Sequence, residues 1–274
     1  MADRLYRTTR QLFNDAPEFR VPPYQREYAW QGTHIDQLLT DIELLDVKTK
    51  PNGNIDPLGS HFLGLLVFID EGEYYSVVDG QQRLSTIIIV SAVARDLIQE
   101  ILKTAKLTDE QRDKLNNTKS AFDDFIFIKS RPFGEKRARL IPNTNNMDLF
   151  TRLILEGGLY EDKNKKLISD FGKNIRRRRY YKAYDHIYQY LTEQVDENGT
   201  AFLINLFVKI DAGVTFIPFV AENDTDAFNL FETLNDRGLN LSALDLIKNK
   251  LLQQANGDLE IFDSDWNQVF GKEG

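Results

Sequence analysis

The sequence has no cysteine and only three histidines, and this scarcity excludes several kinds of site. Without cysteine, the chain cannot be a disulfide scaffold, a Cys-ligated zinc finger, an iron–sulfur protein or a thiol enzyme. The three histidines, His34, His61 and His186, are far apart and form neither a His-x-x-x-His nor a His-Glu-x-x-His pair. The sequence therefore disfavours a metal site built on histidine.

Long apolar runs are also missing. The densest stretches, 62–69 and 84–94, are too short or too interrupted for a membrane span of roughly 20 residues, and we recognise no signal peptide at the N-terminus. The chain carries 34 Lys plus Arg against 42 Asp plus Glu, a net charge of −8. This balance disfavours a uniformly basic nucleic-acid binder but allows a local basic patch. We expect a cytoplasmic protein with no membrane partner.

The hydrophobic pattern divides the 274 residues into three blocks. Block 1–103 mixes strands and helices, with a hairpin of strands 62–69 and 74–78 followed by a buried helix from 84 to about 103. Block 104–212 is mostly helical. Block 213–274 returns to a β-rich run at 214–220, which Pro218 makes an edge strand or a bent strand. This order predicts an α+β fold.

Three features are predicted within the helical block. Thr108 and Gln111 form a capping box, and the glycines at 157–158 close a helix at 147–156. A single long helix runs from about Lys165 to Val195, and residues 136–141 form one short strand.

The strongest local signal is the pentapeptide Asp79-Gly80-Gln81-Gln82-Arg83, at the point where a strand ends and a helix begins. Such a junction offers unpaired backbone N–H groups and the positive end of a helix dipole. Arg83 can hold a phosphate bidentately, and Asp79 can hold Mg²⁺ or orient a water. Ser85 and Thr86 add hydroxyl groups. The residues alone support this anion site and a simple helix start capped by Asp79 about equally.

The second signal is the segment 22–30, PPYQREYAW. Its prolines stiffen the backbone, and Tyr24, Tyr28 and Trp30 bracket Gln25 and Arg26. Aromatic rings can stack on a base, and arginine can reach a phosphate. The alternative is an extended segment whose rings fill the core, above all Trp30.

Two further segments carry polar clusters. In the turn at 235–238, Asn235, Asp236 and Arg237 precede Gly238, which also suits a simple helix C-cap. In the middle block, Arg176, Arg177, Arg178 and Arg179 are consecutive. This run is either a solvated face paired with the excess carboxylates or a contact with phosphate backbones. We interpret the tyrosines that follow it as core packing.

The order VPPYQREYAW, HFLG, VVDGQQRLST and FETLNDRGLNLSALDLIKNKL resembles the DGQQR-motif N-terminal domain of GmrSD-type (Type IV) restriction proteins. The phosphorothioate-sensing SspE proteins are similar. The resemblance covers blocks one and three closely and block two only in its helical character. It implies a ParB/sulfiredoxin-like α/β core with a large, mainly helical insertion and C-terminal helices.

The resemblance also implies a nucleotide site, because DGQQR occupies the position of the phosphate-binding motif of ParB. The expected cofactor is an NTP (GTP or ATP) with Mg²⁺, with Asp79 as the candidate metal ligand. The expected catalytic residues are Asp79, Gln82 and Arg83. The expected nucleotide-binding residues are Tyr24, Gln25, Arg26, Gly80, Gln81, Ser85, Thr86, Asn235, Arg237 and Gly238. The expected DNA-binding or sensing residues are Pro23, Tyr24, Tyr28, Trp30, Arg176, Arg177, Arg178 and Arg179.

Together these features predict an NTP-hydrolysing regulatory and sensing domain of a modification-dependent anti-phage restriction system. The alternative is a reader of a DNA modification, such as a phosphorothioate, without turnover of its own. Expected partners are modified DNA and a nuclease domain in the same or another chain, and a homo-oligomer is left open. The histidines form no His-Asn-His motif, so we expect no nuclease activity from these residues.

Overall fold

The computed structural model describes residues 5–15, 18–129, 136–143, 147–221, 223, 225–228, 230, 248 and 264–266. The elements in chain order are β1 (Arg7–Thr8), α1 (Thr9–Asp15), β2 (Phe19–Arg20), α2 (Gly32–Glu43), β3 (Val47–Thr49), β4 (Ile55–Pro57), β5 (His61–Asp70), β6 (Tyr75–Asp79), α3 (Gln81–Thr104), α4 (Asp109–Ile126), β7 (Phe127–Lys129), β8 (Lys136–Ala138), β9 (Leu140–Ile141), α5 (Met147–Leu155), α6 (Tyr160–Phe171), the 3₁₀ turn η1 (Lys173–Arg177), α7 (Arg179–Asn198), α8 (Ala201–Val208), the π-turn η2 (Lys209–Gly213) and β10 (Val214–Ala221).

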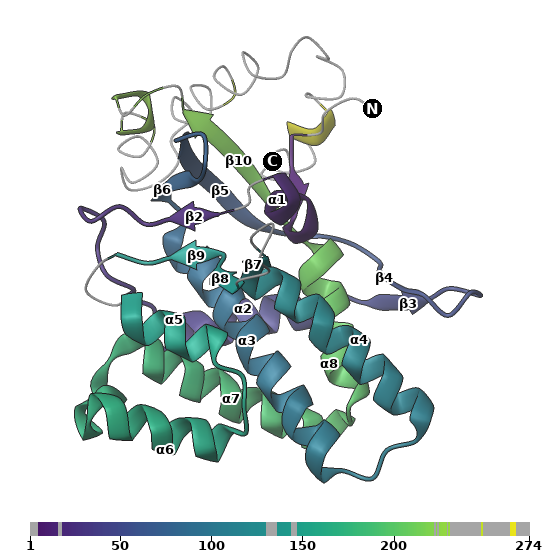
Figure 1. Ribbon diagram of the computed structural model, residues 1–274. Coiled ribbons are helices and arrows are strands. Elements are labelled where there is room, and N and C mark those ends of the chain that lie inside the picture. Colours follow the sequence, from purple (N-terminus) through teal and green to yellow (C-terminus); the bar gives the residue numbers. More distant parts are fainter. Residues whose placement is uncertain are drawn as a thin grey trace.

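A mixed six-stranded sheet carries the fold, with the strand order β1-β10-β5-β6-β2-β9. Most of the helices lie together on one side of this sheet, and the β3–β4 hairpin projects away from it (Figure 1). Strands β5 and β6 pair antiparallel, which confirms the predicted hairpin, whereas β10 joins β5 in parallel from far along the chain. The predicted α+β class is confirmed, and a ParB-like core stays a prediction.

Both faces of the sheet are buried, as the alternation along β5 shows. Leu66 and Phe68 belong to the large core cluster shared with the helices. Leu65, Val67 and Ile69 point the other way, into a second cluster with residues of β10. Successive side chains of a strand face opposite sides, so one apolar run of sequence supplies both layers.

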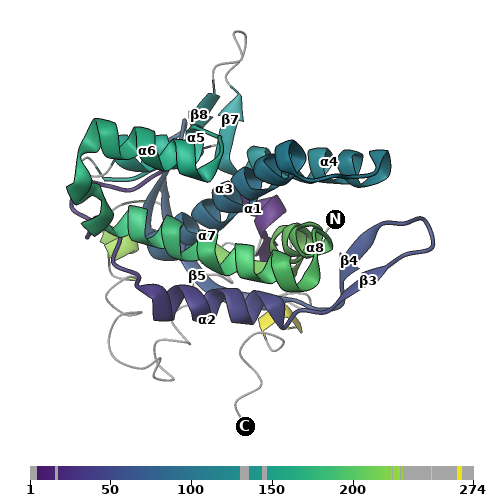
Figure 2. The ribbon, with the colours of Figure 1, turned by 90° about the horizontal axis from the view of Figure 1, so that it is seen from below.

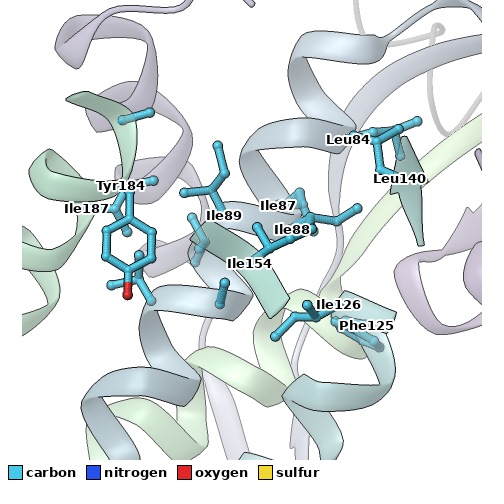
Figure 3. Close-up of a cluster of buried hydrophobic side chains, with 14 of the residues drawn as sticks. Leu84, Ile87, Ile88, Ile89, Phe125, Ile126, Leu140, Ile154, Tyr184 and Ile187 are labelled. Atoms are coloured by element: carbon cyan, nitrogen blue, oxygen red, sulfur yellow. The ribbon is translucent and has the colours of Figure 1, made fainter. Parts of the chain in front are cut away.

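Helix α3 is the centre of the helical layer and is buried on nearly all sides. It lies among α4, α5 and α7 (Figure 2). A helix that is apolar all round must be covered by neighbours on every side. Figure 3 shows Leu84 and Ile87–Ile89 of α3 within the buried side chains contributed by α4, β9, α5 and α7. The main core therefore takes residues from all three sequence blocks.

Three predictions of local structure need correction. The long helix at 165–195 is wrong, because Gly172 adopts a φ of 75° and ends α6, and η1 precedes α7. The strand at 136–141 is divided between β8 and β9, which belong to different sheets. For the strand at 214–220, the edge alternative is wrong because β10 lies inside the sheet, whereas a register shift between Thr215 and Ile217 fits the bent alternative. Because β1 pairs only with Thr215 and Phe216, Pro218 falls beyond the end of that pairing.

A buried charge network joins three helices behind the sheet. The carboxylate of Asp96 accepts hydrogen bonds from Lys163 at 2.6 Å and from Arg95 at 2.9 Å, and also from the hydroxyl of Tyr184. Burial lowers the pKa of Lys163 to about 8, although the nearby Asp96 opposes that shift. The network holds α6 and α7 against α3.

Within the described residues, no helix is both long enough and apolar enough to cross a membrane.

Asp96→Ala is expected to lower the free energy of unfolding by about 3–5 kcal/mol, because it leaves Lys163 and Arg95 buried without their shared carboxylate. Urea denaturation measures the change. Lys114→Ala is the control, since it breaks the exposed ion pair with Glu110 and should leave the unfolding midpoint nearly unchanged. Equal midpoints for the two variants would contradict a stabilising role of the network.

Candidate functional site

A cleft of about 500 Å³ opens where β6 ends and α3 begins. It brings together the first two sequence signals, the DGQQR pentapeptide and the segment 22–30. Its lining residues are Tyr24, Gln25, Arg26, Trp30, Val78, Asp79, Gly80, Gln81, Gln82, Arg83 and Phe228.

The start of α3 forms one edge of this cleft. The N-cap is Gly80, in the left-handed region at φ 95°, so the prediction of Asp79 as N-cap is wrong. Gly80 has no side chain that could cap the helix, and the first turn contains no acidic residue. The N-terminal backbone N–H groups and the positive end of the dipole therefore stay available to an anion.

Arg83 is fixed beside this helix start. Its guanidinium donates to Asp79 Oδ2 at 2.9 Å and to the carbonyl of Leu63 at 3.0 Å, so it ties α3 to β5. Its side chain is 21% exposed and that of Asp79 is 29% exposed. Burial lowers the pKa of Arg83, and the Asp79 carboxylate offsets part of that effect. Both groups therefore face the cleft as an oriented ion pair.

Gly64 makes room for this arrangement. It has a φ of 111°, and a Cβ at this position would collide with Nη1 of Arg83. A Cβ on Gly80 would collide with Leu66 in the same way. Gly64 is a site residue that the sequence patterns above did not predict. The available signal was the tetrapeptide HFLG, which contains both Gly64 and the carbonyl that accepts from Arg83.

The glutamines of the pentapeptide hold the segment 22–30 in place. Gln81 donates to the carbonyl of Arg26 at 2.8 Å. The side-chain oxygen Oε1 of Gln82 accepts from the backbone N–H of Ala29 at 2.8 Å, and its side-chain Nε2 donates to the backbone carbonyl of Glu27 at 3.3 Å. Gln82 is also buried. Its side chain therefore positions the opposite wall while it lines the cleft, and a catalytic role of Gln82 stays a prediction.

Gln25, on the segment 22–30, makes a further hydrogen bond back to β6. Its amide donates to the carbonyl of Val78 at 2.7 Å. Arg26 is different, because its side chain is exposed at the cleft while its carbonyl is the acceptor for Gln81. The segment therefore presents one cation to the cleft on a backbone that α3 and β6 hold.

Three other predicted site residues lie in the core. Thr86 shares a hydrogen bond of 2.8 Å with the hydroxyl of Tyr28, and Ser85 is 1% exposed. The ring of Tyr28 is 3% exposed and stacks on Tyr180 with centroids 4.8 Å apart. None of the three lines the cleft. The structure therefore does not bring Ser85, Thr86 and Tyr28 together with the other predicted site residues, because their side chains are buried in the core.

Tyr24 and Trp30 remain at the surface of the site. Tyr24 is 57% exposed, and its ring lies 5.6 Å from that of Phe228. Trp30 is half-buried and stacks on His34 at 6.0 Å. Trp30 and Arg83 separate the cleft from a smaller recess of about 320 Å³, which His34, Gln37 and Asp41 help to line. Pro23, beside Tyr24, is exposed.

The remaining predicted site residues are placed as follows. Asn235, Arg237 and Gly238 lie outside the described residues. Arg176–Arg179 are exposed on η1 and at the start of α7. No group of three or more His, Cys, Asp or Glu among the residues with described positions could hold a metal ion. Asp79 as a Mg²⁺ ligand stays a prediction.

Fold and cleft define an α+β domain whose cleft opens at a strand-to-helix turn with an uncapped helix N-terminus. Residues 9–252 match the family model of the GmrSD restriction endonuclease N-terminal domain, and the chain belongs to this family. This confirms the resemblance to GmrSD-type proteins and relates the chain to DNA restriction. The similarity to SspE proteins stays a prediction. Comparison with curated proteins gives no match.

Gly64→Ala is expected to destabilise the protein more than Gly53→Ala. Both residues have positive φ, so each substitution carries about 1–2 kcal/mol of backbone strain. Only at Gly64 does the new Cβ meet Arg83, whereas nothing lies within 4 Å at Gly53. Overpacking should add about 1–3 kcal/mol. Thermal unfolding measures both, and equal shifts would mean that Arg83 moves aside freely.

The two tyrosines of the segment 22–30 are expected to respond in opposite ways. Tyr28→Ala should lower the free energy of unfolding by about 3–5 kcal/mol, as for other buried aromatic rings. Tyr28→Phe loses only the Thr86 hydrogen bond, about 1 kcal/mol. The exposed Tyr24→Ala should stay within about 0.5 kcal/mol of the parent. Chemical denaturation of the three variants tests this order, and a stable Tyr28→Ala would refute the core assignment.

Proposed function

We propose that the cleft binds and hydrolyses a nucleoside triphosphate, and that the chain acts as the regulatory and sensing domain of a modification-dependent restriction system. The observation that supports this most is the meeting of an uncapped helix N-terminus with the oriented Arg83 and the exposed Arg26 at one cleft. A triphosphate needs several hydrogen-bond donors and positive groups close together, and this is the combination that the cleft offers.

The phosphates would lie at Gly80 and the first turn of α3. Glycine at that position allows the backbone to approach the ligand closely. Arg83 cannot swing freely, because Asp79 and the Leu63 carbonyl hold it, so it meets developing negative charge without reorganising. Arg26 adds a second positive charge from the opposite wall.

The half-buried ring of Trp30 offers a flat apolar surface on the side of the cleft that borders the smaller recess. A nucleobase can stack on such a surface. We therefore place the base toward Trp30 and His34, with the phosphates toward α3. The recess volume of about 320 Å³ leaves space for a ring at this end.

Hydrolysis requires a water in line with the γ-phosphate and stabilisation of the charge that develops as the bond to the leaving oxygen breaks. Arg83 and Arg26 supply that stabilisation. The second carboxylate oxygen of Asp79, which does not contact Arg83, can accept a hydrogen bond from the attacking water. Mg²⁺ would arrive with the nucleotide and screen the phosphate charges. Among the described residues that line the cleft, Asp79 is the one carboxylate that could reach it.

A second candidate function is recognition of a DNA modification without turnover. The observation that favours it is the exposed ring of Tyr24 beside Phe228 at the same cleft. An apolar, ring-lined pocket suits a large and weakly hydrated group such as a phosphorothioate sulfur. Phosphate release by the purified chain, with and without modified DNA, separates the two functions. A nuclease domain, in the same or another chain, would be the partner that either function controls.

Arg26→Ala is expected to lower the rate of phosphate release by about 100-fold, the usual loss when one donor to a transition state is removed. The side chain is exposed, so the melting temperature should not change. Arg83→Ala is a poorer test, because it also leaves Asp79 without its partner.

Lys48→Ala is the matched control for Arg26→Ala. It removes an exposed cation from the β3–β4 hairpin, which projects away from the sheet (Figure 1). Its rate should equal that of the parent. If Arg26→Ala also keeps the parental rate, the cleft is not a site of NTP hydrolysis.

A further inference from the structure

A dense group of cations lies at the junction of α6 and α7, outside the cleft. Six of the ten residues from 173 to 182 are basic, and none is acidic. We call this group the basic turn; its cations are Lys173, Arg176, Arg177, Arg178, Arg179 and Lys182. All six are exposed, in a chain whose net charge is −8.

The carboxylates of the chain do not neutralise the basic turn. Among the residues that the structure describes, no salt bridge within 4.0 Å involves any of its six cations. Lysines and arginines elsewhere do form such pairs, for example Arg152 with Asp170 at 2.5 Å. Of the interpretation of the arginine run as a solvated face paired with excess carboxylates, the solvated face is confirmed, whereas the pairing is absent within the described part of the chain.

The fold itself gains little from these charges. Arg178 is the N-cap of α7 and Arg179 its first residue, and the first turn contains no acidic side chain. Cations at a helix N-terminus face the positive end of the dipole, which is unfavourable by typically 0.3–1 kcal/mol each. Consecutive arginines also repel one another. Folding therefore does not explain the concentration of charge, whereas a polyanionic ligand does.

The apolar residues of the turn point inward. Ile175 is 1% exposed, and Tyr180 and Tyr181 are buried, which confirms the interpretation of these two rings as core packing. A surface that inserts into a bilayer needs exposed apolar side chains beside its cations. The basic turn has cations alone, so its chemistry fits a phosphate backbone better than a lipid surface.

The basic turn is also joined to the wall of the cleft. Tyr180, which follows Arg179, stacks on Tyr28 of the segment 22–30. Gln82 of α3 holds the next two residues of that segment through their backbone N–H groups. A ligand on the basic turn therefore lies on the same packed unit as the nucleotide cleft.

We propose that the basic turn binds the phosphate backbone of duplex DNA, independently of base sequence. Such contacts position a protein on DNA without specifying a sequence. The proposal does not depend on the proposed NTP hydrolysis, because the two sites share no residue.

The test uses the full chain and a labelled duplex of random sequence, with affinity measured by fluorescence anisotropy over a range of salt concentrations. Replacing Arg176, Arg177, Arg178 and Arg179 by alanine should weaken binding at least tenfold at about 0.1 M salt and reduce the salt slope by about 0.9 per lost contact. Replacing the same four by lysine should retain most of the affinity, because lysine also binds phosphate as a point charge.

The matched control removes the same number of positive charges from other exposed positions, by replacing Lys48, Lys103, Lys106 and Lys114 with alanine. It should bind duplex DNA with nearly the parental affinity and slope. Because all eight side chains are exposed, no variant should lose its fold. The arginine-to-alanine variant should melt no earlier than the parent, since it removes cations from the N-terminus of α7. Phosphate release without DNA should be unchanged in every variant.

Three results would overturn the proposal. The first is an arginine variant with parental affinity and slope. The second is an equal loss in the control, which would mean that net charge alone governs binding. The third is arginine-dependent binding to vesicles of anionic lipid in a protein that does not bind the duplex, which would assign the basic turn to a membrane surface.

Discussion

The ion pair between Arg83 and Asp79 is the interaction on which the site depends. Arg83 reaches from the first turn of α3 to the last residue of β6 and to the carbonyl of Leu63 on β5. This geometry is possible because Gly64 leaves space for the guanidinium and Gly80 allows the sharp change from strand to helix. Arg83 thereby fixes α3 against β5 and β6 at the point where the cleft opens. Its guanidinium, which would meet a negatively charged ligand, is already oriented before the ligand binds.

Gln81 and Gln82 fix the second wall of the cleft, which is the segment 22–30. Gln81 and Gln82 use their amides to hold the backbone of the segment 22–30, and Gln25 returns the contact to Val78. A network of neutral hydrogen bonds of this kind costs little to rearrange compared with a buried ion pair. The wall that carries Arg26 and Tyr24 is therefore the part of the cleft better suited to respond to a ligand.

Helix α3 connects this site with the rest of the molecule. Its first turn forms the cleft, and its middle packs against α4, α5 and α7. Its later part carries Asp96, which holds α6 and α7 through Lys163 and Tyr184. The stack of Tyr28 on Tyr180 is a second contact that links α7 to the cleft wall formed by the segment 22–30. The arginines of the basic turn directly precede Tyr180 in the chain.

The sequence by itself determined the class of the fold, the β5–β6 hairpin, helix α3, the two principal motifs and their family. These depend on local periodicity, on turn residues and on short motifs, all of which neighbouring residues carry. It did not separate the roles within a motif. Gln82 and Arg83 are adjacent and both line the cleft, yet Gln82 holds the backbone of the segment 22–30 and Arg83 pairs with Asp79. Tyr24 and Tyr28 belong to one segment, yet Tyr24 is exposed and Tyr28 is buried. Only the tertiary structure decided these roles, together with the function of Gly64 and the division of the 165–195 region at Gly172. The physical reason is that burial and hydrogen-bond partners come from residues distant in the chain, here Leu63, Ala29 and Tyr180, whose positions no local pattern contains.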